Sequence, residues 1–125
     1  MYTISKEFRF EAAHRLTSLP PEHQCSRPHG HSYRVRVELG SEELTGPGFV
    51  ADFGELAFFG SYLAAAFDHR DLNTVLSFEP TSERLAKYLA GWFIDAAPPH
   101  LDGLLRSVTV METATSSATY HVVPS

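Results

Sequence analysis

The sequence predicts one α+β domain, in which a four-stranded antiparallel sheet carries two helices on one of its faces. Two apolar–polar alternations open the chain, two stretches with helical spacing occupy its middle, and two short strand patterns close it. The order strand, strand, helix, helix, strand, strand is typical of a two-layer fold. At 125 residues, 43% hydrophobic and 20% charged, the chain is expected to form a single domain over residues 1–125.

The first two strands are expected over residues 2–15 and 29–40. In the first, the apolar side chains fall mostly at even positions, such as Ile4, Phe8 and Phe10, and the odd positions from 3 to 11 are polar, so one face of the strand should be buried. In the second, Tyr33, Val35 and Val37 alternate with charged side chains. Between the two strands, residues 16–28 form a proline-containing loop that carries the only cysteine, Cys25.

Two amphipathic helices are expected in the middle of the chain. Residues 54–67 repeat large apolar side chains at helical spacing, and a polar loop over residues 68–73 follows. The second helix should begin with Thr81 or Ser82 as N-cap and end before the prolines at 98–99.

The last two strands are expected around residues 108–112 and over residues 118–123. Glu112 has the same parity as Val108 and Val110, which turns its carboxylate toward the buried face. The outer strands of the sheet would have no cover within the chain, and pairing between subunits commonly protects such edges. The sequence therefore predicts a homo-oligomer.

Three histidines can converge where the first two strands meet. His29 and His31 are two residues apart on one strand, so both point to one face, and His14 lies on the apolar face of the other strand. Three imidazoles that leave a fourth position open are typical of a catalytic zinc site. Cys25 as a fourth ligand would instead close a structural site, and histidines that simply end a strand or bond to backbone are the plain alternative.

Charge and composition narrow the possible partners. The formal net charge of −5 argues against a general nucleic-acid surface. The N-terminus lacks the apolar run of a signal peptide, and no apolar stretch has the length of a membrane helix. A single cysteine forms no internal disulfide, which is typical of proteins in a reducing compartment. We therefore expect a cytoplasmic protein, and the lack of a long apolar stretch leads us to expect no membrane contact.

Five ordered motifs resemble the 6-pyruvoyl-tetrahydropterin synthase family, and together they cover nearly the whole chain. They are Phe-Glu-Ala-Ala-His-Arg-Leu at 10–16, Cys-x-x-x-His-Gly-His at 25–31, Phe-Asp-His-Arg-Asp-Leu-Asn at 67–73, Pro-Thr-Ser-Glu at 80–83 and Val-Met-Glu-Thr at 110–113. The resemblance implies a role for each polar residue in them. His14, His29 and His31 would bind zinc, Cys25 and the pair Asp68 and His69 would be catalytic, and Glu112 would anchor a pterin ring.

The resemblance also implies a substrate and an assembly. The substrate would be 7,8-dihydroneopterin triphosphate, and the fold would be the tunnelling fold, whose sheets join into an oligomeric barrel, a hexamer, with active sites between subunits. The short length of the chain and the residues of the first two motifs are most similar to the bacterial branch of the family. That branch is a lyase of the queuosine pathway, which releases triphosphate and acetaldehyde and leaves 6-carboxytetrahydropterin. The branch that retains the pyruvoyl side chain, and a zinc- or pterin-binding protein without turnover, are the alternatives. Cys25 argues against a branch that uses glutamate in its place.

Overall fold

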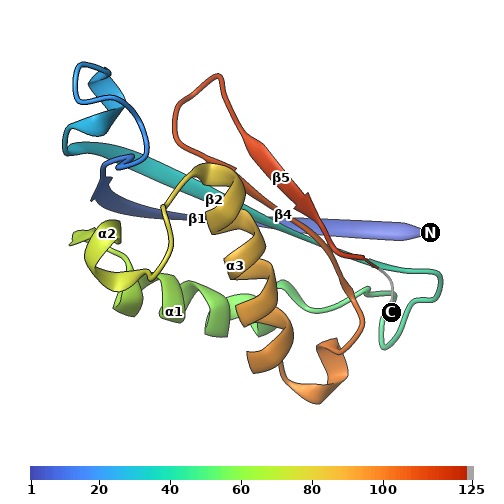
Figure 1. Cartoon of the computed structure of the whole chain (residues 1–125). Helices are drawn as coiled ribbons and strands as arrows, with labels where there is room; N and C mark the ends of the chain where they lie inside the picture. The colour runs from blue at the N-terminus through green and yellow to red at the C-terminus, as the bar shows by residue number, and fades with distance from the viewer. Residues whose placement is uncertain (124–125) are drawn as a thin grey trace.

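A five-stranded sheet forms the centre of the computed structural model, which describes residues 1–123 (Figure 1). The strand order is β3-β1-β2-β4-β5. The strands are β1 (Tyr2–His14), β2 (His29–Ser41), β3 (Arg70–Asp71), β4 (Leu105–Met111) and β5 (Ala118–His121). The pairs β1–β2, β2–β4 and β4–β5 are antiparallel, as the alternating patterns predicted.

The predicted sheet of four antiparallel strands is wrong in one respect, because β3 adds a fifth strand that runs parallel to β1. Its partners are Ala12 and Ala13, and the backbone N–H of His69 donates to the carbonyl oxygen of Glu11 at 2.6 Å just before the pairing begins. A strand of two residues shows no periodicity, so the sequence suggested only a polar loop there. The sheet is therefore mixed.

The helices are α1 (Ala57–Ala66), α2 (Leu72–Val75) and α3 (Ser82–Ala96), with 3-10 turns η1 (Gln24–Ser26), η2 (Phe53–Leu56) and η3 (Pro99–Leu101). The first expected helix begins as η2, because Asp52 and Glu55 form a capping box there. The short α2 was not predicted. Thr81 caps α3 as expected, accepting from the N–H of Arg84 at 3.2 Å. None of the described helices is both long and apolar enough to cross a bilayer.

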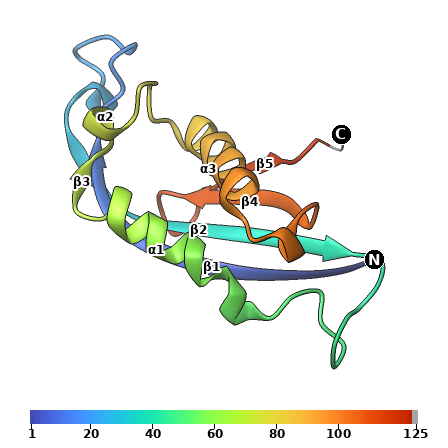
Figure 2. The same cartoon turned by 90° about the horizontal axis from the view of Figure 1, so that it is seen from below.

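The core lies between one face of the sheet and the helices α1 and α3 (Figure 2). Tyr33 pairs with Phe10 on β1, and Val35 pairs with Val110 on β4, so their side chains share that face. All four are buried. Burying a large apolar side chain stabilises the fold by about 1.5–3 kcal/mol, so this face fixes the register of the sheet.

The same register brings the predicted histidines together. His14 is the partner of His29, and His31 is the partner of Ala12, two residue pairs further along the ladder. Side chains of directly opposed residues point to the same face, so the three imidazoles extend the buried face beyond Phe10 and Tyr33. The candidate site therefore lies at the end of the β1–β2 ladder, next to the core.

Candidate metal centre and its surroundings

The imidazoles of His14, His29 and His31 form a cluster in which one nitrogen of each ring lies within 4.8 Å of the others. His14 is 2% exposed, and the other two rings are half-buried. The ring centroids are 4.5–4.9 Å apart. Among residues 1–123 this is the group of histidine, cysteine and acidic side chains that could hold a metal ion, and Cys25 is not part of it.

Backbone carbonyls set the tautomers of two of these rings. The Nδ1 atom of His14 donates to the carbonyl oxygen of Pro80 at 2.8 Å, and Nδ1 of His29 donates to that of Arg27 at 2.8 Å. A carbonyl oxygen only accepts, so each Nδ1 carries the proton and each Nε2 offers its lone pair. This arrangement is typical of metal-binding histidines.

The spacing of two of the nitrogens fits a tetrahedral ion. The Nε2 atoms of His14 and His31 are 3.1 Å apart. Zinc–nitrogen bonds of about 2.0–2.1 Å at tetrahedral angles place two ligand nitrogens about 3.3 Å apart. Three imidazoles and no thiolate also leave a coordination position for a substrate or water, so the donor set fits a catalytic metal ion.

Burial lowers the pKa of His31, and the neighbouring imidazoles of His14 and His29 lower it further, whereas the Glu112 carboxylate acts in the opposite direction. The neutral imidazole is the form that binds a metal. The 3.7 Å contact between Nε2 of His31 and Oε2 of Glu112 is an ion pair only when His31 is protonated. Because the pKa of His31 is lowered, the Glu112 carboxylate contacts a neutral imidazole at neutral pH.

Cys25 lies on the loop between β1 and β2, in the turn η1. Its backbone N–H donates to Nδ1 of His23 at 3.0 Å, and its carbonyl oxygen accepts from the N–H of Leu16 at 2.8 Å. The thiol is free and half-buried. His23 was not predicted as part of the site, although it stands two residues before the only cysteine.

Asp68 and His69 lie beside β1, on the side where β3 pairs. Oδ1 of Asp68 accepts from the N–H of Glu11 at 2.9 Å, and Oδ2 lies 3.7 Å from Nε2 of His69, which is longer than a hydrogen bond. His69 has a positive φ of 57°, and its side chain is 79% exposed. The structure thus holds the two residues side by side and leaves the imidazole free to meet another group.

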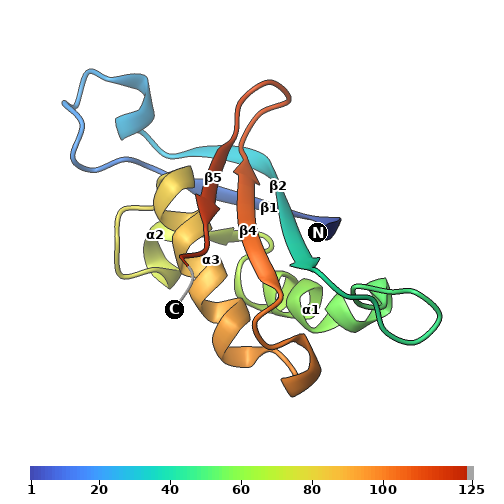
Figure 3. The same cartoon turned by 90° about the vertical axis from the view of Figure 1, so that its right-hand side faces the viewer.

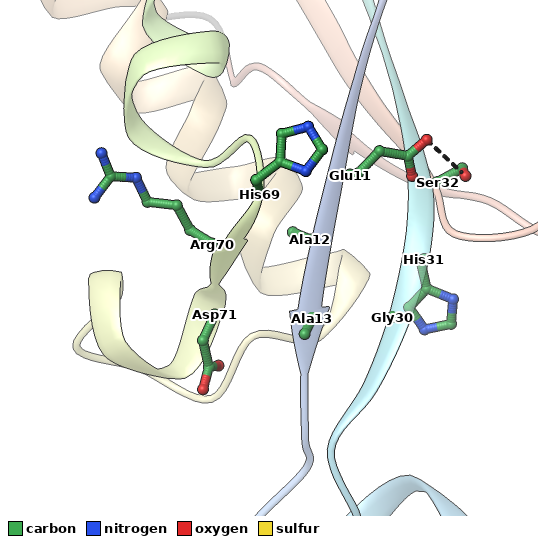
Figure 4. Close-up of a pocket in the computed structure, with 9 residues that line it drawn as sticks. All are labelled: Glu11, Ala12, Ala13, Gly30, His31, Ser32, His69, Arg70 and Asp71. Carbon is green, nitrogen blue, oxygen red and sulfur yellow. Dashed lines mark hydrogen bonds between the residues drawn. The ribbon is translucent and has the colours of Figure 1, made fainter.

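An open cavity of about 630 Å³ lies against this part of the sheet. Figure 4 shows His69, Arg70 and Asp71 on one side of β1, and Gly30, His31 and Ser32 on the other. The hydroxyl of Ser32 donates to Glu11 at 2.9 Å across the strands. His69 therefore lies apart from the histidine cluster within one chain, separated from His31 by β1.

Glu112 directly follows the end of β4, one residue beyond the strand that was expected to include it. Oε1 accepts from the hydroxyl of Ser82 at 2.6 Å, and Oε2 faces His31. The carboxylate lines a cavity of about 360 Å³ together with Leu16, Thr81, Ser82, Glu83, Ser116, Ser117 and Ala118. Ser82 was considered only as a helix cap, because nothing in the local pattern links it to Glu112.

Comparisons with known proteins identify the family of the chain. The family model for 6-pyruvoyl tetrahydropterin synthase matches residues 3–122. A Synechocystis sp. protein named 6-carboxy-5,6,7,8-tetrahydropterin synthase is 43% identical over 96% of this chain and 93% of its own. An Aquifex aeolicus protein of the same name is 32% identical over 95% of this chain and 97% of its own.

Among solved structures, a Caenorhabditis elegans 6-pyruvoyl tetrahydropterin synthase superposes with a TM-score of 0.84 at 28% identity, covering 98% of this chain and 96% of its own. The Plasmodium falciparum protein described by the same name superposes with a TM-score of 0.68 at 17% identity, over 97% of each chain. The second likeness concerns the fold alone.

Proposed function

The chain belongs to the 6-pyruvoyl tetrahydropterin synthase family, and from that premise we propose that it is a zinc-dependent lyase acting on 7,8-dihydroneopterin triphosphate. The product would be 6-carboxy-5,6,7,8-tetrahydropterin, with loss of triphosphate and acetaldehyde, as a step of 7-deazapurine synthesis. The relatives named 6-carboxy-5,6,7,8-tetrahydropterin synthase support this branch. One structural observation carries the proposal: the carboxylate of Glu112 faces the histidine cluster at 3.7 Å.

Glu112 is proposed as the anchor of the pterin ring. A carboxylate can accept two parallel hydrogen bonds, which matches the adjacent N–H and amino donors on the pyrimidine edge of a pterin. The cavity of about 360 Å³ beside it gives a flat ring room to approach. A substrate held there would extend its side chain toward His31, because the Glu112 carboxylate already faces that ring.

His14, His29 and His31 are proposed as the ligands of a zinc ion. When bound, such an ion acts as a Lewis acid that lowers the pKa of substrate hydroxyls and polarises a neighbouring carbonyl. His14 and His29 would offer their Nε2 lone pairs, because the carbonyl oxygens of Pro80 and Arg27 accept from their Nδ1 atoms.

Two separate groups are proposed to move protons. Cys25 would act as the base at the substrate side chain once its thiol is ionised, and His69 would carry the other proton, held beside Asp68. His69 is exposed and lies across β1 from His31. We therefore propose that the pair serves the histidine cluster of a neighbouring copy, in a homo-oligomer whose sheets join as in the tunnelling fold.

The experiment that tests the function is product analysis by mass spectrometry. The purified protein, loaded with zinc, is incubated with 7,8-dihydroneopterin triphosphate. A carboxylated tetrahydropterin together with acetaldehyde supports the proposal. The likeness to the Caenorhabditis elegans structure favours a second candidate, 6-pyruvoyl tetrahydropterin formation, which would retain the three-carbon side chain. If neither product forms, the result would indicate a binding protein without turnover.

A further inference from the structure

The loop between β1 and β2, residues 15–28, projects beyond the sheet and carries Cys25 (Figure 3). Apart from the neighbouring His29, which bonds to Arg27, two side chains of the described residues outside this loop hydrogen-bond to it. Asn73 binds both backbone groups of Arg15, at 2.8 and 3.0 Å, where the loop leaves β1. Glu79 binds the loop further out, at Thr17 and Ser18.

The Glu79 carboxylate uses both oxygens for this contact. Oε1 accepts from the backbone N–H of Ser18 at 2.7 Å and from the hydroxyl of Thr17 at 3.4 Å, and Oε2 accepts from the hydroxyl of Ser18. These hydrogen bonds lower the pKa of Glu79, so the group is ionised at neutral pH. Hydrogen bonds to a charged acceptor are stronger than those to a neutral one.

Glu79 is itself tied to the body of the protein. Its carbonyl oxygen accepts from the N–H of Thr81 at 2.9 Å, and Thr81 is the N-cap of α3. The next residue, Pro80, is the one whose carbonyl oxygen accepts from Nδ1 of His14. Two consecutive residues thus hold the loop that carries the thiol and orient a histidine of the candidate metal centre.

Ser18 connects to Cys25 by a short path. Leu16, two residues before Ser18, donates its N–H to the carbonyl oxygen of Cys25 at 2.8 Å and accepts from the N–H of Leu19 at 3.4 Å. The stretch held by Glu79 is therefore bonded directly to the turn that contains the thiol. Loss of the Glu79 hydrogen bonds would therefore remove a restraint on residues 16–19 and on the turn that contains Cys25.

We propose that Glu79 is a positioning residue, which sets where the Cys25 loop stands relative to the histidine cluster. The inference rests on the proposed function, because it assumes that Cys25 reacts with a substrate bound at that cluster. Glu79 forms no hydrogen bond to Cys25 or to the histidines of the cluster. A displacement of about 1 Å at a reacting group can lower turnover about 100-fold.

The test compares four variants of the zinc-loaded protein. Glu79→Ala removes every contact to the loop, whereas Glu79→Gln keeps one acceptor for the Ser18 N–H and can donate to its hydroxyl. Ser18→Ala removes the hydroxyl and keeps the backbone contact. Asp95→Ala is the matched control, because Asp95 is an exposed carboxylate on α3 with no hydrogen bond or ion pair among the described residues.

Four quantities are measured for each variant: amide hydrogen exchange over residues 16–27, bound zinc, kcat and KM. Glu79→Ala should speed exchange in that segment by about tenfold or more and lower kcat by about 10- to 100-fold, with KM and zinc content unchanged. Glu79→Gln and Ser18→Ala should fall between Glu79→Ala and the wild type. Asp95→Ala should match the wild type.

Wild-type exchange rates in Glu79→Ala would overturn the inference, whatever the activity. So would a loss confined to KM, or a Glu79→Gln variant as poor as Glu79→Ala, because Gln preserves part of the contact. Failure of the proposed function looks different: the wild type itself would form no product, while the exchange measurement would still decide whether Glu79 holds the loop.

Discussion

Nδ1 of His14, the last residue of β1, donates a hydrogen bond of 2.8 Å to the carbonyl oxygen of Pro80, two residues before α3 begins. The bond joins segments that are 66 residues apart in the chain. It leaves the lone pair of the His14 ring on Nε2, which lies 3.1 Å from Nε2 of His31. The orientation of the His14 ring within the cluster therefore depends on the fold around α3 as well as on the strand that carries the histidine.

Replacing any one of His14, His29 or His31 by alanine should abolish stoichiometric zinc binding, because two imidazoles alone make half of a typical site. Cys25→Ala should keep one zinc per chain, because the thiol lies outside the cluster. Metal analysis of the purified variants measures both. The control is His121→Ala on β5, an exposed histidine outside the cluster. Zinc loss in Cys25→Ala would make the cysteine a ligand.

Cys25→Ala and Glu112→Ala should affect turnover in different ways. Removing a general acid or base typically lowers the rate about 10²- to 10⁴-fold, so Cys25→Ala and His69→Ala should lose kcat in that range. Asp68→Asn should lose less, because it alters only the neighbour of His69. Glu112→Ala should mainly raise KM, since it removes an anchor that acts on the bound substrate. Steady-state kinetics separate the two classes, and the reverse pattern would refute the role assignment.

Mixing two inactive variants should restore activity if the site is shared between subunits. His31→Ala lacks a proposed metal ligand and His69→Ala lacks the exposed imidazole, so neither homo-oligomer should turn over. A mixed oligomer, formed by unfolding and refolding the two together, would contain some sites with an intact cluster beside an intact His69. The measurement is activity against the mixing ratio, with the unmixed variants as controls. Mixed oligomers without activity would place both groups in one chain's site.

The stability of the metal-free protein should fall as the pH decreases below 6.5, the ordinary pKa of a histidine. The pKa of His31 is lowered in the folded state, mainly by burial, so the unfolded chain binds the proton more readily in this window. Proton uptake then favours unfolding. Urea titrations at several pH values measure the effect, and His31→Gln should flatten this part of the curve.

Glu79 acts in a separate pH window, below its ordinary pKa of 4.5, where protonation costs the folded state its hydrogen bonds to Ser18.

Tyr33→Phe should leave stability unchanged or raise it by about 1 kcal/mol, because a buried polar group without a partner costs free energy. Tyr33 is 1% exposed, and its hydroxyl has no hydrogen-bond partner among the described residues. Tyr62→Phe is the matched control, since its hydroxyl is hydrogen-bonded to that of Tyr88 at 2.8 Å. That change should destabilise the protein by about 0.5–1.5 kcal/mol in chemical denaturation. A clear loss of stability in Tyr33→Phe would indicate a bound water or ligand at the hydroxyl.

The strands β1 and β2 and the helix α3 could be predicted because each has a local pattern: alternation for the strands, and a capped amphipathic repeat for the helix. The polar stretch over residues 68–73 could not, because β3 exists only through its pairing with Ala12 and Ala13. Its two residues gain their structure from β1 rather than from their own sequence.

The sequence by itself determined that His29 and His31 share a strand face, that His14 ends an apolar face, and that Glu112 has the parity of a buried strand position. Side-chain direction along a strand follows from its two-residue period, which is a local property. Only the tertiary structure decided that His14 stands opposite His29, that Pro80 orients His14, and that Glu79 holds the Cys25 loop. These contacts join segments up to 66 residues apart, and their register is set by burial of the shared core face, which no local pattern encodes.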